Sequence, residues 1–128
     1  MVGIVIVSHS QRLAEGVVEL AKMMASDAHI VAAGGLEDGT PGTSFEKISN
    51  AVEEVYSEDG VGVLMAMGSA VMTTEMVIEA MEDKKIVMLD GPVVEGGIVA
   101  ALEASMGTPL DELQSKVDEA RETKKLDL

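Results

Sequence analysis

Four short runs of apolar residues punctuate the chain, and none of them alternates apolar with polar positions. They cover residues 2–7, 29–33, 61–67 and 85–90. Continuous apolar runs of this length are typical of strands that are buried on both faces of a parallel sheet. We therefore expect four strands, each buried on both faces and covered by helices.

Apolar residues recur at the helical period in five segments between and after these runs. Three of the stripes are Leu13, Val17, Leu20, Ala21 and Met24; Phe45, Ile48, Val52, Val55 and Tyr56; and Leu110, Leu113, Val117 and Ala120. The remaining helices are expected at about residues 70–81 and 95–106. Thr43 and Glu46 fit a capping box at the start of the second helix, and Thr108 fits the N-cap of the fifth.

This alternation of strands and helices predicts a three-layer α/β/α fold with a mainly parallel sheet of four or five strands. The 128 residues are expected to form a single domain, with a frayed tail from about residue 123. Ligands of open parallel sheets bind beyond the carboxyl ends of the strands. Functional side chains are therefore expected in residues 8–10, 34–44, 68–70 and 91–97.

The composition narrows the class of protein. The formal net charge is −14, which repels nucleic-acid phosphates and anionic lipids, so we expect neither nucleic acid nor membrane insertion. Basic protein partners suit such a surface, although an acidic surface can also serve solubility alone. The absence of cysteine excludes thiolate catalysis. No apolar stretch is long enough for a membrane span, so the protein is expected to be cytoplasmic, and its ten methionines are expected to fill gaps in the core.

His9 is the leading candidate for chemistry, because it follows the first strand and precedes the first helix. A neutral imidazole can attack a phosphoryl group near neutral pH, and a helix N-terminus favours the resulting anion. Position alone also fits a histidine that only satisfies hydrogen bonds. His29 lies at the opposite edge of the expected sheet, so we expect it to be structural or solvent-facing. That separation of the two histidines argues against a metal site.

Glycine- and hydroxyl-rich turns follow the second and third strands, at residues 42–44 and 68–70. Backbone N–H groups in such turns can bind phosphate oxygens. Ser10 can either cap the first helix or bind a phosphate on His9. The candidate phosphate pocket consists of Ser10, Thr43, Ser44, Gly68 and Ser69.

Other chemistries lack their motifs. The chain has no Walker-type phosphate loop, no G-x-G-x-x-G and no G-x-S-x-G elbow, so we expect no nucleotide cofactor and no serine hydrolase. A response-regulator receiver would need an aspartate after the third strand, where Ala66, Met67 and Gly68 stand.

Four segments in this order resemble the DhaM family of dihydroxyacetone kinase phosphotransfer subunits, which is related to the mannose-class IIA domains of the bacterial phosphotransferase system. The resemblance covers about residues 1–107. The matching segments are GIVIVSHSQRLAEGVVELAKMM (3–24), AAGGLEDGTPGTSFEKI (32–48), MGSAVMTTEM (67–76) and GPVVEGG (91–97).

The resemblance implies that His9 accepts a phosphoryl group, on Nε2, from the histidine-containing phosphocarrier protein. It implies further that His9 passes the group to ADP on a DhaL subunit, which serves dihydroxyacetone bound to DhaK. In the sugar-permease branch of the family the acceptor is a IIB domain instead. The resemblance also implies a homodimer.

One position departs from the family pattern. The family has an aspartate two residues before the glycine of the GSA motif, and this chain has Ala66. The family carboxylate holds the other ring nitrogen of the histidine, so its loss opens a third interpretation. The domain could be a degenerate regulatory module that does not transfer phosphate.

Overall fold

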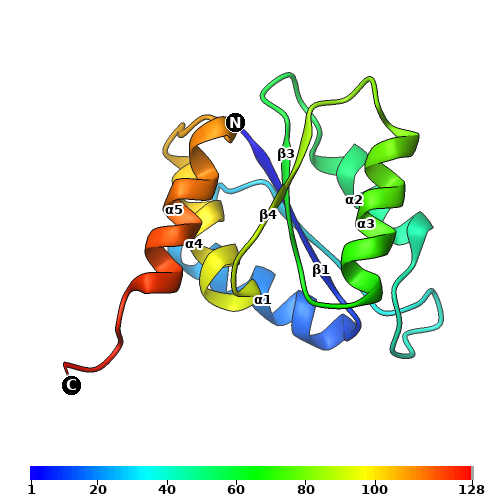
Figure 1. Cartoon of the computed structure of the whole chain (residues 1–128), viewed down its shortest axis with the longest axis horizontal. Helices are drawn as coiled ribbons and strands as arrows, with labels where there is room; N and C mark the ends of the chain where they lie inside the picture. Colours follow the sequence, from blue (N-terminus) through cyan, green and yellow to red (C-terminus); the bar gives the residue numbers. More distant parts are fainter. Residues whose placement is uncertain (128) are drawn as a thin grey trace.

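Four parallel strands form one sheet between two layers of helices in the structure, a computed structural model that describes residues 1–127 (Figure 1). The strands are β1 (Gly3–Ser8), β2 (Ile30–Gly34), β3 (Val61–Met65) and β4 (Ile86–Leu89). The helices are α1 (Gln11–Met24), α2 (Phe45–Val55), α3 (Ser69–Ala80), α4 (Val93–Ser105) and α5 (Leu110–Glu122). The predicted three-layer α/β/α fold is confirmed, with four strands.

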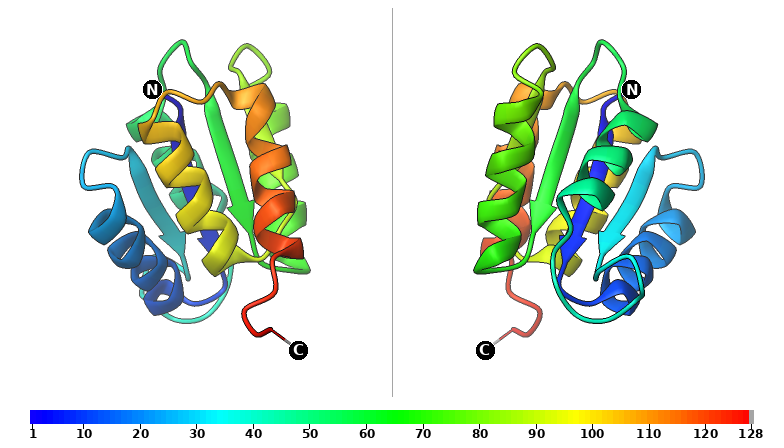
Figure 2. Two further views of the ribbon diagram at one scale, coloured as in Figure 1. Left: turned by 90° about the vertical axis from the view of Figure 1, so that its left-hand side faces the viewer. Right: turned by 90° about the vertical axis from the view of Figure 1, so that its right-hand side faces the viewer.

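The strand order is β2-β1-β3-β4, so β1 and β3 are central. Val5 of β1 lies in register with Val31 of β2 on one side and with Val63 of β3 on the other. Helices α1, α4 and α5 cover one face of the sheet, whereas α2 and α3 cover the other (Figure 2). The chain therefore leaves β1 and β3 toward opposite faces. This divergence creates a topological switch point between the two central strands, where ligands of such sheets bind.

Alternate residues of the central strands supply two hydrophobic cores, because successive strand side chains point to opposite faces. Ile4, Ile6 and Leu64 face α1, α4 and α5. Val5 and Val63 face α2 and α3. Every residue of β1 and β3 is buried, as predicted.

The prediction that all four strands are buried on both faces is wrong for β4. This strand has four residues and lies at the edge of the sheet, where Val87 is exposed and only Leu89 is fully buried. The opposite edge strand, β2, is intermediate, because Val31 and Ala32 are half-buried.

The apolar stripe predicted for α1 is also partly wrong. Ala14, Val17 and Ala21 form its buried face, and Leu13 and Leu20 are exposed. Small side chains face inward because α1 packs against both the sheet and α4. The methionine prediction is partly wrong as well. Met65, Met81 and Met88 pack in the core under α2 and α3, but six of the ten are exposed: Met23, Met24, Met67, Met72, Met76 and Met106.

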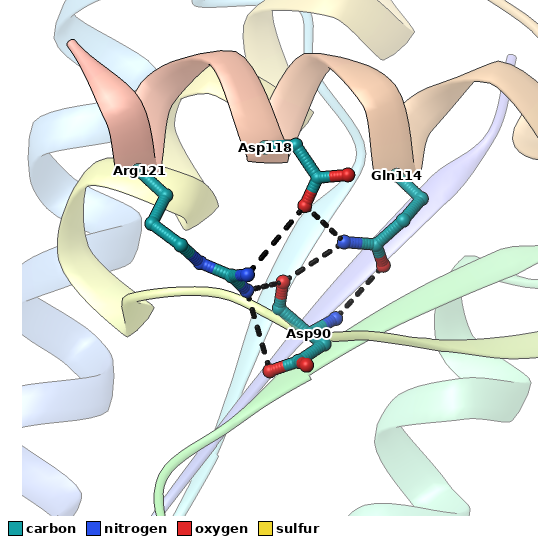
Figure 3. Close-up of polar contacts among 4 residues, drawn as sticks. All are labelled: Asp90, Gln114, Asp118 and Arg121. Atoms are coloured by element: carbon teal, nitrogen blue, oxygen red, sulfur yellow. Dashed lines mark hydrogen bonds and ion pairs between the residues drawn. The ribbon is translucent and has the colours of Figure 1, made fainter.

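Helix α5 is attached to the end of β4 by a polar cluster (Figure 3). The Gln114 side chain accepts a hydrogen bond from the Asp90 backbone N–H and donates one to the Asp90 carbonyl, both at 2.9 Å. Arg121 donates to the same carbonyl and pairs with the Asp90 carboxylate at 3.3 Å. The C-terminal end of α5 therefore lies at the carboxyl ends of the strands.

The two ends of the last helix can be compared with their predictions from the sequence. Pro109 is the N-cap of α5, so the prediction of Thr108 as N-cap is wrong; the Thr108 hydroxyl instead donates to the Glu103 carboxylate at 2.8 Å. The tail from residue 123 is non-helical through residue 127, and Leu128 lies outside the described residues. Within residues 1–127, no helix combines the length and apolar character needed to span a bilayer.

Candidate active site

The backbone around His9 is held by the loop that follows β2. The Ser8 carbonyl accepts a hydrogen bond from the Gly35 N–H at 3.1 Å, and the His9 carbonyl accepts one from the Gly42 N–H at 2.9 Å. The Ser8 hydroxyl also accepts from the Ser10 N–H at 3.1 Å. His9 is thus fixed at the carboxyl end of a buried central strand, with its side chain half-buried at the switch point.

One hydroxyl group contacts the His9 imidazole, and two more are linked to that hydroxyl through a chain of hydrogen bonds. Nε2 lies 2.9 Å from the Ser69 hydroxyl, at the start of α3. The Thr43 hydroxyl, from the loop before α2, donates to the Ser69 oxygen at 3.0 Å and lies 3.2 Å from the Thr73 hydroxyl. The structure therefore brings His9, Thr43 and Ser69 together, as the sequence predicted. Because hydroxyl groups rotate, this cluster can donate hydrogen bonds to the oxygens of a group on Nε2.

Thr73 also belongs to this cluster, although it was not among the site residues predicted from the sequence. It follows Ser69 by four residues, so the two side chains lie on the same face of α3. That spacing was the available signal.

The turn before α3 depends on a glycine. Gly68 has a φ of 62°, in the left-handed region that side chains with a Cβ rarely adopt. No side chain caps α3. The positive end of this helix dipole therefore faces the hydroxyl cluster, a favourable environment for an anion.

Ser10 and Ser44 both act as helix caps. The Ser10 hydroxyl accepts from the Leu13 N–H at 3.2 Å at the start of α1, so the expected cap is confirmed and its role toward phosphate stays a prediction. The Ser44 hydroxyl accepts from the Lys47 N–H at 3.1 Å and donates to the Glu37 carboxylate. Ser44 is therefore committed to these two contacts, and neither of them involves the His9 cluster.

The predicted capping box of Thr43 and Glu46 is wrong, because Ser44 is the N-cap of α2. Ser44 has the extended backbone that lets a cap side chain reach the third N–H of the helix, that of Lys47. Thr43 is thereby free to point toward Ser69.

Further polar contacts fix the loop between β2 and α2. The Lys47 ammonium donates to the carbonyls of Gly34 and Leu36 at 2.8 and 3.3 Å. The Ser44 hydrogen bond lowers the pKa of Glu37, and hydrogen bonds from Thr40 lower the pKa of Asp38. Both carboxylates are exposed. Because their pKa values are lowered, they stay ionised at pH values below the usual carboxyl range, and they keep this loop negatively charged.

At the family aspartate position, Ala66 packs against the core under α2 and α3, and its N–H donates to the Val7 carbonyl at 3.0 Å. Among residues 1–127 no carboxylate is hydrogen-bonded to the His9 imidazole. His29, by contrast, is exposed just before β2, as expected for a solvent-facing residue, and its carbonyl accepts from the Ile4 N–H at 2.8 Å.

Comparison with known proteins identifies the family to which the chain belongs. The sequence profile of the EIIA-man family, described as the PTS system fructose IIA component, matches residues 3–114. The chain belongs to the EIIA-man family. Within EIIA-man, its relatives include DhaM proteins, so the resemblance drawn from the sequence is confirmed.

Two DhaM relatives and one solved structure illustrate the match. The phosphoryl donor subunit DhaM of a PEP-dependent dihydroxyacetone kinase 1 from Listeria innocua is 39% identical over 104 residues, which cover 81% of this chain and 82% of the relative. The DhaM of Providencia stuartii is 33% identical over 135 residues, covering all of this chain but only 28% of the relative. The chain thus spans just over a quarter of the length of that longer protein.

The crystal structure of the phosphotransferase system component EIIA from Streptococcus agalactiae has the same fold. It matches this EIIA-man chain with a TM-score of 0.71 at 23% identity, covering 94% of this chain and 92% of that one.

Proposed function

We propose that this EIIA-man chain is the phosphoryl-carrying subunit of a dihydroxyacetone kinase. His9 takes a phosphoryl group from the histidine-containing phosphocarrier protein and passes it to ADP held on a DhaL subunit, which works with DhaK. The observation that carries this proposal is the contact of His9 Nε2 with the Ser69 hydroxyl at the switch point. The names of the DhaM relatives support the dihydroxyacetone branch.

The hydrogen-bond chain orients His9 for nucleophilic attack. The Ser69 oxygen accepts from Thr43 and keeps its own proton, which it donates to Nε2 when that ring nitrogen is unprotonated. Nε2 then carries the lone pair, and the ring proton resides on Nδ1. This is the tautomer that a nucleophilic imidazole needs for reaction through Nε2.

Charging and discharge each exchange one bond to phosphorus. Nε2 attacks the phosphorus of the donor phosphohistidine, an N–P bond forms, and the electron pair of the broken bond stays on the donor imidazole. In discharge a terminal phosphate oxygen of ADP attacks, and the pair of the His9 N–P bond returns to Nε2. Ser69 and Thr43 hydroxyls donate to the phosphoryl oxygens, which is the positioning on which phosphoryl transfer mainly depends. Ser10, Gly68 and the first turns of α1 and α3 complete the phosphate pocket.

Raising the salt concentration is expected to slow the phosphorylation of His9 by the donor protein. The net charge of −14 steers a basic donor surface toward the site, and salt screens that attraction. Between about 0.01 M and 1 M salt the Debye length falls from about 30 Å to about 3 Å, and we expect the second-order rate constant to fall about tenfold. Rapid mixing with pre-charged donor measures it, and a rate constant unchanged by salt would exclude steering.

Ala66→Asp is expected to accelerate phosphorylation. A carboxylate on the second ring nitrogen of His9 would add a charge-assisted hydrogen bond worth about 1.5–3 kcal/mol, which corresponds to roughly 10- to 100-fold in rate if it acts fully in the transition state. The single-turnover rate constant is the readout. Ala66→Asn offers a hydrogen bond without the charge, and an equal gain in both variants, or none in Ala66→Asp, would contradict this role for the carboxylate.

Two other functions use the same face of the sheet. In a sugar-permease IIA domain His9 would discharge to a IIB domain, and a comparison of ADP-loaded DhaL with IIB as acceptor distinguishes the branches. The regulatory-module alternative is favoured by Ala66 alone and predicts no phosphohistidine when charged donor is supplied.

We further propose that the protein is cytoplasmic and forms a homodimer. Sedimentation equilibrium tests the oligomeric state.

A further inference from the structure

Three exposed methionines stand beside the His9 cluster. Met67, in the turn before α3, is 77% exposed, and Met72 and Met76, on α3, are 66% and 56% exposed. We call these three residues the methionine stripe. Large apolar side chains at such exposure gain nothing from the fold, because their surface stays in water.

The stripe continues the functional face of α3. Ser69, Met72, Thr73 and Met76 are spaced i, i+3, i+4 and i+7, so they form one row along the helix. Ser69 contacts the His9 imidazole and Thr73 lies beside Thr43. The methionines therefore begin next to Ser69, whose hydroxyl contacts Nε2, and extend away from it along α3.

The surroundings of the stripe are acidic and contain no basic residue of α3. Glu75 and Glu79 are the charged residues of this helix, and both are exposed. No lysine or arginine occurs between residues 48 and 83. The face thus has an apolar centre with a negative border, and its complement is an apolar patch bordered by positive side chains.

We propose that the methionine stripe is the docking surface for the protein that delivers the phosphoryl group to His9. This inference rests on the proposed function, in which a protein donor must reach Nε2 and therefore cover the surface around it. The donor contributes an apolar patch with a basic rim. Unbranched methionine side chains adapt their shape to such a partner without a rigid pocket, which suits brief, repeated encounters.

The double variant Met72→Ser with Met76→Ser tests the docking surface. Both side chains are exposed, so the fold is expected to persist. We expect the KM for charged donor protein to rise at least about tenfold while kcat stays within about twofold, since docking and not chemistry is altered. Met72→Leu with Met76→Leu keeps the apolar surface and is expected to restore the wild-type KM.

Met23→Ser with Met24→Ser is the matched control. These methionines are 78% and 63% exposed at the far end of α1, away from the carboxyl ends of the strands. Their replacement is expected to leave KM unchanged. Phosphoramidate, a small donor that phosphorylates imidazole without docking, should charge wild type and every variant at the same rate.

Methyl NMR of the methionines provides a readout that does not depend on transfer. Addition of uncharged donor protein should shift the methyl resonances of Met67, Met72 and Met76 and leave those of Met23 and Met24 in place. If the methyl resonances of the stripe shift but wild type is not phosphorylated, the proposed function is contradicted and the docking surface is supported. Phosphorylation of wild type without shifts, or a double-serine variant with wild-type KM, would overturn the docking surface.

Two further outcomes would also overturn it. Normal charging of the double-serine variant with slow discharge would assign the stripe to the acceptor. A dimeric wild type and a monomeric double-serine variant in sedimentation would assign the stripe to a second copy of the chain.

Discussion

Replacing His9 with alanine is expected to abolish phosphorylation completely. Nε2 is the nucleophile in the proposed transfer, and alanine offers no atom to which phosphorus can bond. Incubation with phosphoenolpyruvate, Enzyme I and the histidine-containing phosphocarrier protein, followed by intact mass, should show one added phosphate on wild type and none on His9→Ala. The cluster of Ser69, Thr43 and Thr73 cannot replace the imidazole, because their hydroxyls are far weaker nucleophiles at neutral pH.

His29→Ala is the matched control for this experiment. His29 is the second histidine of the chain and is exposed before β2, at the opposite end of the sheet from His9. This variant should be labelled as wild type is. A label that survives in His9→Ala would place the phosphate on another residue. Wild type that stays unlabelled, while a known DhaM is labelled in parallel, would leave the regulatory module as the function.

Gly34→Ala is expected to destabilise the protein by about 3 kcal/mol, a large fraction of the 5–15 kcal/mol that holds a typical domain folded. A Cβ at Gly34 would lie 2.5 Å from the Ser10 carbonyl oxygen, 2.8 Å from Ala14 Cβ and 2.9 Å from Gln11 Cα. Two of these atoms are backbone, so the whole start of α1 must move away from β2. Because His9 lies directly before this helix, phosphorylation should slow as well.

Gly16→Ala makes the same substitution within α1 where there is room. A Cβ at Gly16 would meet nothing within 4 Å, so the alanine is expected to stabilise the helix by about 0.5–1 kcal/mol. Urea unfolding of both variants measures the two effects, with the m-value as a check on two-state behaviour. Equal destabilisation by both, or none by Gly34→Ala, would contradict the close approach of α1 to β2.

The strands could be predicted from the sequence because their apolar runs were continuous and bounded by polar or glycine-containing turns. The same rule placed His9 and Ser69 correctly at one end of the sheet, since carboxyl ends of parallel strands lie together. Exposure could not be predicted for β4, because a run of apolar residues reads the same at the edge of a sheet as at its centre. Val87 is exposed because β4 lies at the edge of the sheet.

Errors on the helices have a different origin. Thr43 and Ser44 are adjacent hydroxyl residues, and which of them caps α2 depends on the direction from which the chain enters the helix. In α1, hydrophobicity favoured Leu13 and Leu20 for the core. The close packing with the sheet and α4 buries Ala14 instead, next to Val17 and Ala21, which the stripe had placed correctly. Neither the direction in which the chain enters α2 nor the close packing of α1 against α4 can be read from the sequence.

The hydrogen bond and ion pair between Arg121 and Asp90 determine the position of any segment fused to the C-terminal side of α5. Because they hold the end of α5 at the carboxyl ends of the strands, a fused domain or purification tag there starts on the same side of the molecule as His9. A fused phosphoryl partner on a short flexible linker would experience an effective concentration of about millimolar. A bulky inert tag at that end would crowd the histidine, so the N-terminus, at the opposite end of β1, is the better place for a fluorophore or an affinity handle.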